Sequence, residues 1–252
     1  MLLTIDVGNT NSVLGLFDGP ELVESWRIKT DAQTTADEMI LTFRGLLTGR
    51  PPLTGIALCS TVPAVLHELR LMLDRYFPDV ETVIVEPGVK TGVPVVTDNP
   101  REVGADRIVN TLAVFERYGG PAIVVDFGTS TNLDVVSARG EFLGGALAPG
   151  IQISLDALAA RAAQLRKVEL VRPRSAIGRN TVEALQSGAL YGFAGQVDGL
   201  VRRITQELGD VEAVVATGGL AEIVVAESET ITDHDPFLTL YGLQLVFDRN
   251  RP

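Results

Sequence analysis

Cysteine, histidine and basic residues are all scarce in this chain of 252 residues. The single cysteine, Cys59, excludes an internal disulfide, and its position after the apolar residues 56–58 predicts a core thiol rather than a reactive one. The two histidines, His67 and His234, have no cysteine or second histidine near them at the spacing of zinc ligands, so we expect no zinc site. His67 falls within a predicted helix, as a surface or packing residue.

Lysine and arginine number 21 against 32 aspartates and glutamates, which gives a net charge of −11. Nucleic acids and anionic membranes are held by clustered basic residues, so neither is expected as a partner. No apolar run approaches the ~18 residues of a membrane span, and the N-terminus lacks the basic region of a signal peptide. We therefore expect a soluble cytoplasmic protein that holds any anionic ligand locally, through backbone donors, a metal ion or single basic side chains.

One short motif, Asp-x-Gly-x-(Thr/Ser), occurs at Asp6–Thr10 and again at Asp126–Ser130. Each copy lies between two apolar runs, which predicts two strands joined by a tight polar turn. Such a turn can offer backbone N–H groups and hydroxyls to phosphate while its aspartate holds a hydrated metal ion. A single copy could equally be an ordinary hairpin turn. Two copies at the start of two similar halves favour a nucleotide site and two domains rather than one.

The first half is predicted to form three strands followed by alternating helices and strands. The expected elements are strands at 2–6, 12–17, 22–28, 55–60 and 81–85, and helices at 34–47 and 63–76. A further helix is predicted to start at Asn99, with Pro100 in the first position and Glu102 completing a capping box. Its end at residues 119–121 sets the expected boundary between domains 1–119 and 120–252.

The second half repeats the opening of three strands, with the second at 133–136 and the third at 142–147, and then continues with helices. The first of these helices follows Pro149-Gly150 and has four apolar residues along one side: Leu155, Leu158, Ala162 and Leu165. A long helix runs from Asn180, which forms a second capping box with Glu183, towards Leu208. A strand at 211–216 then leads through the turn 217–220 into a final helix. That turn is either a place where adenine or ribose lies close to backbone or a plain helix entry.

Four glycines occur within the long helix, at positions 188, 192, 195 and 199. Glycine inside a helix costs about 0.5–1 kcal/mol relative to alanine, so four of them need a reason. Close approach of another backbone, from a neighbouring helix, a ligand or a second subunit, is one interpretation. A break into two helices is the other.

Two domains that both open with three meandering strands and this motif resemble the actin, hexokinase and Hsp70-type ATPase superfamily. The resemblance implies an α/β fold of two similar ribonuclease-H-like domains, each a mixed sheet flanked by helices, with the nucleotide in a cleft between them. Within the superfamily the chain is most similar to type III pantothenate kinases over nearly its whole length. The similar segments, besides the first motif, are Lys90–Gly92, Asp98–Asn110, Asp126–Thr129, Gly144–Gly145, Pro149–Gly150, Ala216–Leu220 and Asp235–Leu240.

The resemblance implies that ATP phosphorylates the primary hydroxyl of pantothenate to 4'-phosphopantothenate, the first step of coenzyme A synthesis. Phosphoryl transfer depends mainly on positioning and charge neutralisation, so it requires a phosphate-binding turn, a hard cation and an acceptor for the hydroxyl proton. Asp6 is expected to hold Mg²⁺ with ATP, directly or through water. The residues expected to contact ATP and its phosphates are Asp6, Val7, Gly8, Asn9, Thr10, Asn11, Ser12, Val13 and Thr129.

The segment Gly104-Ala105-Asp106-Arg107 matches the substrate-binding motif of the family, in which the aspartate accepts the hydroxyl proton. By spacing alone, Asp106 and Arg107 are an ordinary acid and an ordinary base on a helix surface. In the second turn of a capped helix, however, the carboxylate of Asp106 would be held in a fixed position, as a base must be to reach a substrate hydroxyl. The planar guanidinium of Arg107 suits the carboxylate of pantothenate or the moving phosphate.

Three further residues have roles that come from the resemblance. Asp126 matches an aspartate that binds a monovalent cation, K⁺ or NH₄⁺, and the alternative is that it only caps its own turn. Thr181 matches a threonine that contacts substrate, commonly across a homodimer interface, and the alternative is that it only belongs to a helix cap. Thr97 departs from the family, because many members carry a tyrosine here that lines the pantothenate pocket.

Two other functions compete with this assignment. One is a kinase of the same superfamily that acts on a sugar or carboxylate, but such kinases lack the Gly-Ala-Asp-Arg segment. The other is a non-catalytic ATP-binding regulator, which loss of the equivalents of Asp6 or Asp106 would favour. Both aspartates are present in this chain. We therefore expect a kinase that is a homodimer.

Overall fold

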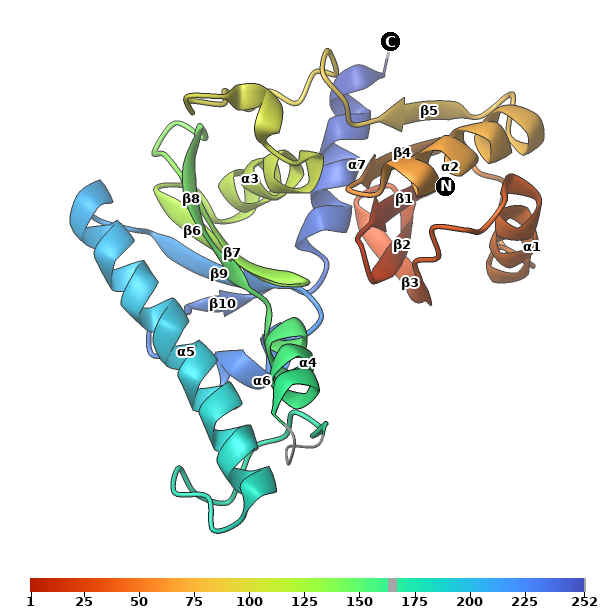
Figure 1. Ribbon diagram of the computed structural model, residues 1–252. Coiled ribbons are helices and arrows are strands. Elements are labelled where there is room, and N and C mark those ends of the chain that lie inside the picture. The colour runs from red at the N-terminus through yellow and green to blue at the C-terminus, as the bar shows by residue number, and fades with distance from the viewer. Residues whose placement is uncertain (163–166, 252) are drawn as a thin grey trace. The chain divides into compact units, whose positions relative to one another are not determined.

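The computed structural model describes residues 1–162 and 167–251 and divides the chain into two compact units (Figure 1). The first unit comprises residues 1–92, 99–113 and 239–252, and the second comprises residues 93–98 and 114–238. The chain therefore passes between units more than once, unlike the continuous halves 1–119 and 120–252 expected from the sequence. The domain boundary and the cleft expected beside it stay predictions.

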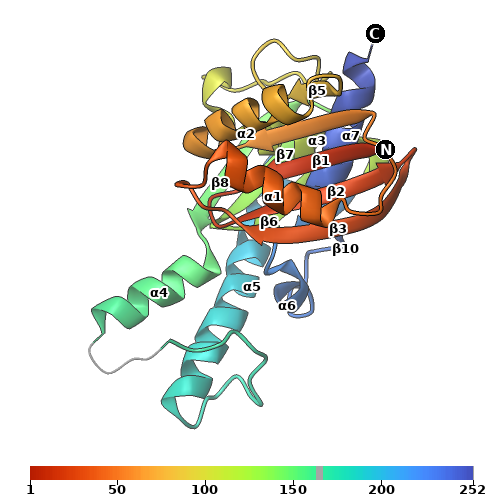
Figure 2. The same ribbon diagram turned by 90° about the vertical axis from the view of Figure 1, so that its right-hand side faces the viewer.

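The first unit is built on a mixed sheet of five strands (Figure 2). The strands are β1 (Leu2–Val7), β2 (Asn11–Asp18), β3 (Glu21–Lys29), β4 (Gly55–Ser60) and β5 (Glu81–Ile84), in the order β3-β2-β1-β4-β5. β1, β2 and β3 form an antiparallel meander, while β4 pairs parallel with β1 and β5 parallel with β4. All five strands agree with the sequence prediction to within one or two residues.

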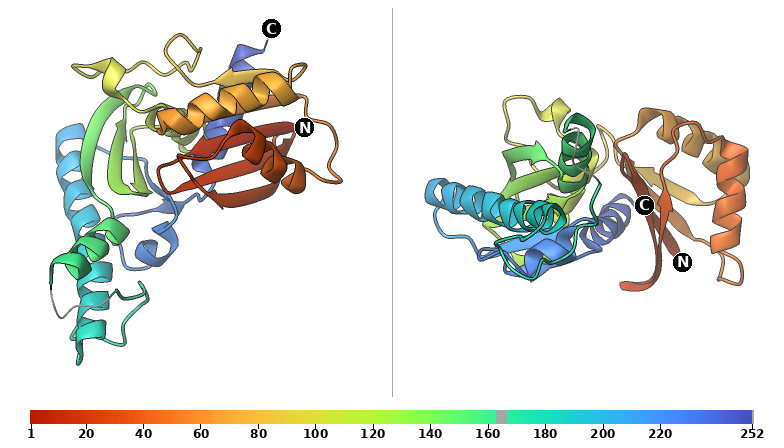
Figure 3. Two further views of the ribbon diagram at one scale, coloured as in Figure 1. Left: turned by 45° about the vertical axis from the view of Figure 1, so that its right-hand side comes forward. Right: turned by 60° about the horizontal axis from the view of Figure 1, so that its bottom comes forward.

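Alternation along β1 assigns its side chains to opposite faces of this sheet. Leu3, Ile5 and Val7 form the core with two helices on one face, α1 (Ala36–Leu46) and α2 (Pro63–Tyr76) (Figure 3). The opposite face carries Asp6 and receives α7 (Leu238–Asn250). Glycines make room for α7, because a Cβ at Gly15 would lie 2.8 Å from Leu240 and a Cβ at Gly55 would overlap Phe247. No helix was predicted at 238–250.

The helix predicted to start at Asn99 is interrupted. A 3₁₀ turn, η1 (Pro100–Glu102), ends at Val103, whose backbone is extended at φ −76° and ψ 123°. Asn99 makes no side-chain cap, and instead its amide donates to the carboxylate of Glu102. A new helix, α3 (Ala105–Tyr118), then begins. The helix-start residues Pro100 and Glu102 therefore belong to the 3₁₀ turn. Asp106 lies in the first turn of α3 rather than in the second turn of a longer helix.

The second unit repeats the same sheet topology. Its strands are β6 (Ala122–Phe127), β7 (Ser130–Val136), β8 (Phe142–Pro149), β9 (Ala213–Thr217) and β10 (Asp233–His234), in the order β10-β9-β6-β7-β8. The core of one face includes residues from α4 (Ile151–Arg161), α5 (Thr181–Leu208) and α6 (Ala221–Val225). Two similar mixed sheets flanked by helices confirm the predicted fold class.

Some helix predictions in the second unit were wrong. α4 ends at Arg161, so Ala162 is its extended C-cap and lies outside the helix in which it was predicted, and Leu158 is 44% exposed. Leu165 lies outside the described residues. α5 is one continuous helix, so the glycines do not break it. α6, which follows the turn 217–220, is short and is not the final helix.

Among the residues that the structure describes, no helix is both long and apolar enough to span a membrane.

Candidate active site

Residues 8–11 form the turn between β1 and β2, closed by the pairing of Val7 with Ser12. The N–H of Gly8 donates to the carbonyl of Asn11 at 3.1 Å, and a Cβ at Gly8 would also lie 3.1 Å from that oxygen. Gly8 therefore shapes the turn, since a larger residue would crowd it. Asn9, Thr10 and Asn11 are exposed. The turn thus leaves three polar residues exposed, and its binding of phosphate stays a prediction.

Asp6 lies at the end of β1, in register with Val13 of β2 and Cys59 of β4. The Cys59 thiol donates to Asp6 Oδ1 at 3.4 Å. Burial raises the pKa of Asp6 to about 7, the negative charge of Asp106 adds to this increase, and the Cys59 hydrogen bond opposes it. Cys59 is 1% exposed, which confirms a core cysteine. Its contact with Asp6 was missed, because it depends on the long-range register of β1 and β4.

Asp106 lies at the start of α3, where its carboxylate folds back over Gly104. A Cβ at Gly104 would lie 2.5 Å from Asp106 Oδ1, so glycine leaves the space that this carboxylate occupies. The backbone N–H of Arg107 donates to the same oxygen at 2.9 Å. Burial raises the pKa of Asp106, against the lowering effects of the N–H and guanidinium of Arg107. The structure thus places two carboxylates of raised pKa, Asp6 and Asp106, near each other in the first unit.

Asp126 occupies the equivalent position on β6, in register with Asn132 of β7 and Thr217 of β9. Directly paired residues project from the same face of a sheet. Asn132 is 8% exposed, and its Oδ1 is buried without a hydrogen-bond partner among the described residues. Gly218, at φ +92°, completes the surroundings, because a Cβ there would lie 2.4 Å from Asp126 Oδ1. Asn132 was not identified as a site residue from the sequence. Pairing the two predicted strands on either side of the turn would have placed it opposite Asp126.

Thr129 is exposed in the second turn, and its carbonyl accepts the N–H of Gly150 at 3.0 Å. A Cβ at Gly150 would lie 2.3 Å from that carbonyl oxygen. The Pro149-Gly150 segment therefore packs directly against the turn that carries Thr129.

Thr181 is exposed at the first position of α5. The helix is capped by Asn180, whose side chain accepts the N–H of Glu183 at 2.9 Å. The carboxylate of Glu183 accepts the N–H of Arg179 at 3.1 Å and also binds Arg174. The cap thus forms at Asn180 without the hydroxyl of Thr181, which leaves that hydroxyl available for another contact.

Thr97 belongs to the second unit, beside Gly144. Its Oγ1 is buried and has no hydrogen-bond partner among the described residues. A buried hydroxyl without a partner is costly, so this atom is suited to contact a ligand.

Cations fit the two aspartate sites chemically. Asp6 is a carboxylate whose ionisation is opposed by burial and by Asp106, so a divalent cation would relieve the repulsion. Within the described residues, no three histidine, cysteine, aspartate or glutamate side chains form a group that could hold a metal. Mg²⁺ commonly uses one or two carboxylates together with water and phosphate. The carboxylate of Asp126 and the amide oxygen of Asn132 are donors of the kind that suit a hard monovalent cation.

Solved structures with this fold include ATP-binding and sugar-phosphorylating proteins. A putative Baf family transcriptional activator from Campylobacter jejuni matches with a TM-score of 0.60 and 18% identity, over 98% of both chains. The activator of 2-hydroxyisocaproyl-CoA dehydratase from Clostridium difficile, solved with ADPNP, matches with a TM-score of 0.59 and 15% identity, over 98% of this chain and 94% of the other. A ROK hexokinase from Thermus thermophilus matches with a TM-score of 0.52 and 15% identity, over 99% of both chains. These likenesses show that the chain shares the fold of those proteins.

A family model for type III pantothenate kinase matches residues 2–203. Type III pantothenate kinases from Salinispora arenicola and Frankia alni are each 68% identical to this chain, over 99% of its length and 100% of theirs. The chain belongs to the type III pantothenate kinase family.

Proposed function

We propose that the protein transfers the γ-phosphate of ATP to the primary hydroxyl of pantothenate, forming 4'-phosphopantothenate in the first step of coenzyme A synthesis. The observation that carries this proposal is the placement of Asp106 near Asp6, in a chain 68% identical to type III pantothenate kinases over almost its full length. The alternative of a non-catalytic ATP-binding regulator has no support, because both aspartates are present and lie near each other.

Asp106 is the proposed acceptor of the pantothenate hydroxyl proton. A carboxylate works best as a general base when its pKa lies near the working pH, and burial moves the pKa of Asp106 in that direction. The Arg107 N–H and the space above Gly104 fix the carboxylate in one orientation. Arg107 itself would bind the pantothenate carboxylate or the transferred phosphate through its guanidinium.

The turn 8–11 is the proposed binding segment for the phosphates of ATP, with Val7, Ser12 and Val13 in the strands that flank it. Asp6 would hold Mg²⁺, which neutralises charge on the phosphates when bound. Thr129 is a further proposed contact for ATP. A reaction that consumes ATP fits the cytoplasm, where we place the protein.

Asp126 is the proposed ligand of a monovalent cation, K⁺ or NH₄⁺. Three observations support it: the register with Asn132, the buried amide oxygen without a partner, and Gly218, where a side chain would collide with the carboxylate. A cation bound here would neutralise the charge of the Asp126 carboxylate.

We further propose that the protein is a homodimer and that Thr181 contacts pantothenate, together with Thr97. The four glycines of α5 support the dimer, because a Cβ at Gly188, Gly192, Gly195 or Gly199 would meet no described atom outside the helix backbone within 4 Å. Spacings of four, three and four residues place them on one helix face. That face thus has room for a second subunit.

A coupled assay of ADP release, run with pantothenate in K⁺ and again in Na⁺, tests the function and the cation site separately. We expect turnover that requires pantothenate and is at least tenfold faster in K⁺. Absence of turnover with pantothenate under every cation would overturn the assignment. Equal rates in K⁺ and Na⁺ would overturn only the role of Asp126.

A further inference from the structure

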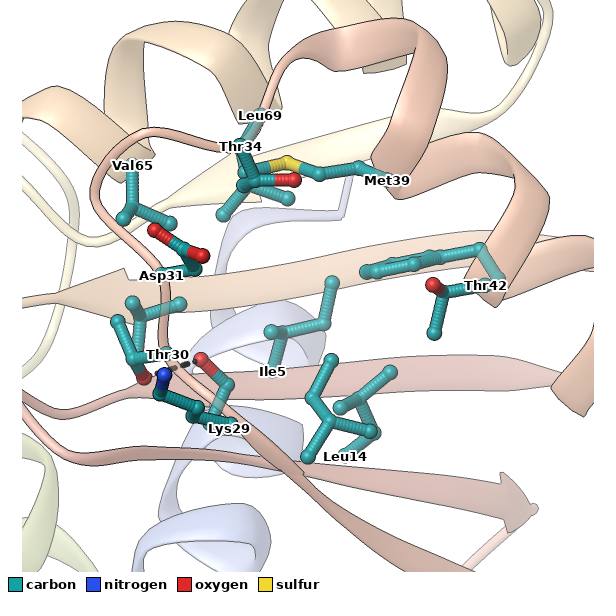
Figure 4. A pocket seen from close by; sticks show the side chains of 14 residues that line it. Ile5, Leu14, Lys29, Thr30, Asp31, Thr34, Met39, Thr42, Val65 and Leu69 are labelled. Carbon is teal, nitrogen blue, oxygen red and sulfur yellow. Dashed lines mark hydrogen bonds between the residues drawn. The ribbon is translucent and has the colours of Figure 1, made fainter.

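A cavity of about 130 Å³ lies in the first unit, between the sheet and the helices α1 and α2 (Figure 4). It occupies the face of the sheet opposite to Asp6, and two of the residues proposed above to contact ATP, Val7 and Ser12, also line it. Most of its wall is apolar and buried, formed by Ile5, Val7, Leu14, Met39, Phe43, Val65 and Leu69. An apolar cavity of about 150 Å³ in another protein stays dry and binds benzene, so this one is large enough for a single ring or a branched aliphatic group.

Most of the remaining wall is polar, and much of it comes from the end of β3 and the segment that follows it. Thr30 and Thr34 are half-buried, whereas Lys29 and Asp31 are exposed and carry opposite charges. An ionic ligand would meet one favourable and one unfavourable charge there, so the cavity favours a neutral molecule. The threonine hydroxyls can exchange hydrogen bonds with a hydroxyl on such a molecule.

Thr30 also connects this cavity to the turn 8–11. Its backbone N–H donates to the carbonyl of Thr10 at 3.0 Å, and its hydroxyl lies 2.9 Å from that of Ser12, another wall residue. Figure 4 shows the hydrogen bond between these two hydroxyls at the edge of the cavity. A molecule that displaces Thr30 therefore acts on both Thr10 and Ser12.

We propose that this cavity is a second ligand site, which takes a neutral molecule with one benzene-sized apolar group and a hydroxyl, and that its occupation is transmitted through Thr30 to the phosphate-binding turn. Binding itself does not depend on the proposed function. Its transmission to catalysis rests on the nucleotide role proposed for the turn.

The three methionines of the chain allow a direct test with benzyl alcohol as the probe. Met39 lines the cavity, whereas Met72 is fully buried in the same core but does not line it. In protein labelled with ¹³C at the methionine methyls, we expect a saturable shift of Met39 with nuclear Overhauser contacts to the ring, and no change at Met72. No saturable change at Met39, or equal changes at both methyls, would overturn the site.

Two variants of α1 provide a matched comparison. Thr42 is exposed at the cavity wall, whereas its neighbour Leu41 is 68% exposed and does not line the cavity. We expect Thr42→Phe to weaken benzyl alcohol binding at least tenfold, while Leu41→Phe binds as the wild type does. Equal affinity of both variants would contradict the proposal.

The effect of cavity binding on the phosphate-binding turn is measured by NMR shifts of backbone amides and by turnover in the same samples. Saturating benzyl alcohol should shift the amides of Thr10 and Ser12 and change the KM for ATP of the wild type but not of Thr42→Phe. Binding without any change at these amides would overturn the transmission and leave the site standing. Failure of the proposed function would appear differently, as absent pantothenate turnover before any probe is added.

Discussion

Asp6 and Asp106 place opposing demands on the folded protein. The proposed mechanism places both carboxylates near the phosphates, but burial and mutual repulsion make it costly to ionise Asp6. The folded protein therefore holds a proton on Asp6 at pH values where the unfolded chain has lost it. A cation at Asp6 would remove this cost, which links binding of Mg²⁺ with ATP to stability.

Asp6→Asn is expected to raise the stability of the metal-free protein at pH 8 while abolishing activity. The pKa of Asp6 rises from 3.8 to about 7 on folding, so its contribution to stability falls as pH rises between these values. We expect Asp6→Asn to raise the free energy of unfolding by about 1–3 kcal/mol at pH 8 and by almost nothing at pH 4. This range is smaller than the full pKa shift implies, because Asp6 is only half-buried and solvent screens part of the effect. Chemical denaturation of both proteins, in buffer with EDTA to remove metal ions, measures this difference in stability at the two pH values.

Asp18→Asn is the control for this experiment, because Asp18 is exposed at the end of β2. It should change stability by less than about 0.5 kcal/mol at either pH. If Asp6→Asn and wild type had the same pH dependence, the buried charge inferred at Asp6 would be wrong.

At the scale of elements, α5 is fastened to the segment before β10 by one buried carboxylate. Asp198 is 5% exposed and accepts from the backbone N–H groups of Glu229 and Thr230 and from the hydroxyls of Ser228 and Thr230. Burial alone would raise the pKa of Asp198, but these donors outweigh it and the pKa is lowered. The ionised form is therefore part of the fold.

Asp198→Asn should destabilise the protein by about 1.5–3 kcal/mol at pH 7, because an amide NH₂ would face N–H donors that now bind a carboxylate. Because folding lowers the pKa of Asp198, its carboxylate stabilises the fold at pH values above its pKa in the unfolded chain. The difference in stability between Asp198→Asn and wild type should therefore shrink as pH falls through the folded pKa of Asp198. Glu229→Gln is the matched control, since it removes only an exposed ion pair with Arg202. Equal losses in both variants would contradict this role of Asp198.

Local pattern predicted the elements well and their long-range neighbours poorly. The bounds of β4 and α2 were predicted to the residue, because apolar periodicity and Pro63 mark them locally. The contact of Cys59 with Asp6 depends on a parallel register set by the whole sheet. The extended backbone at Val103 likewise overrides a good local helix start. Family resemblance therefore identified Asp106 as a site residue, whereas only the structure shows that its carboxylate lies over Gly104.

For the whole molecule, the exposed glycines of α5 make a specific prediction about assembly. Gly192→Leu should leave the subunit folded, because a side chain there has open space and helix propensity rises by about 0.5–1 kcal/mol. If the glycine face is the dimer interface, the variant should be a monomer at micromolar concentration by analytical ultracentrifugation. Gly45→Leu is the control, since Gly45 is a helical glycine of α1 with equally open space. A dimer that persists in Gly192→Leu would exclude this face.

The proposed function depends most on Asp106 as the base that accepts the pantothenate hydroxyl proton. The most direct test compares wild type with Asp106→Asn in one experiment, measuring 4'-phosphopantothenate by mass spectrometry and Mg²⁺–ATP binding by calorimetry. Loss of a positioned general base should lower kcat by about 10²–10⁴-fold, while the fold and ATP binding are retained. Asparagine at 106 keeps an oxygen for the Arg107 N–H, so the local backbone should survive. A variant that binds ATP and still phosphorylates pantothenate at the wild-type rate would contradict the central claim.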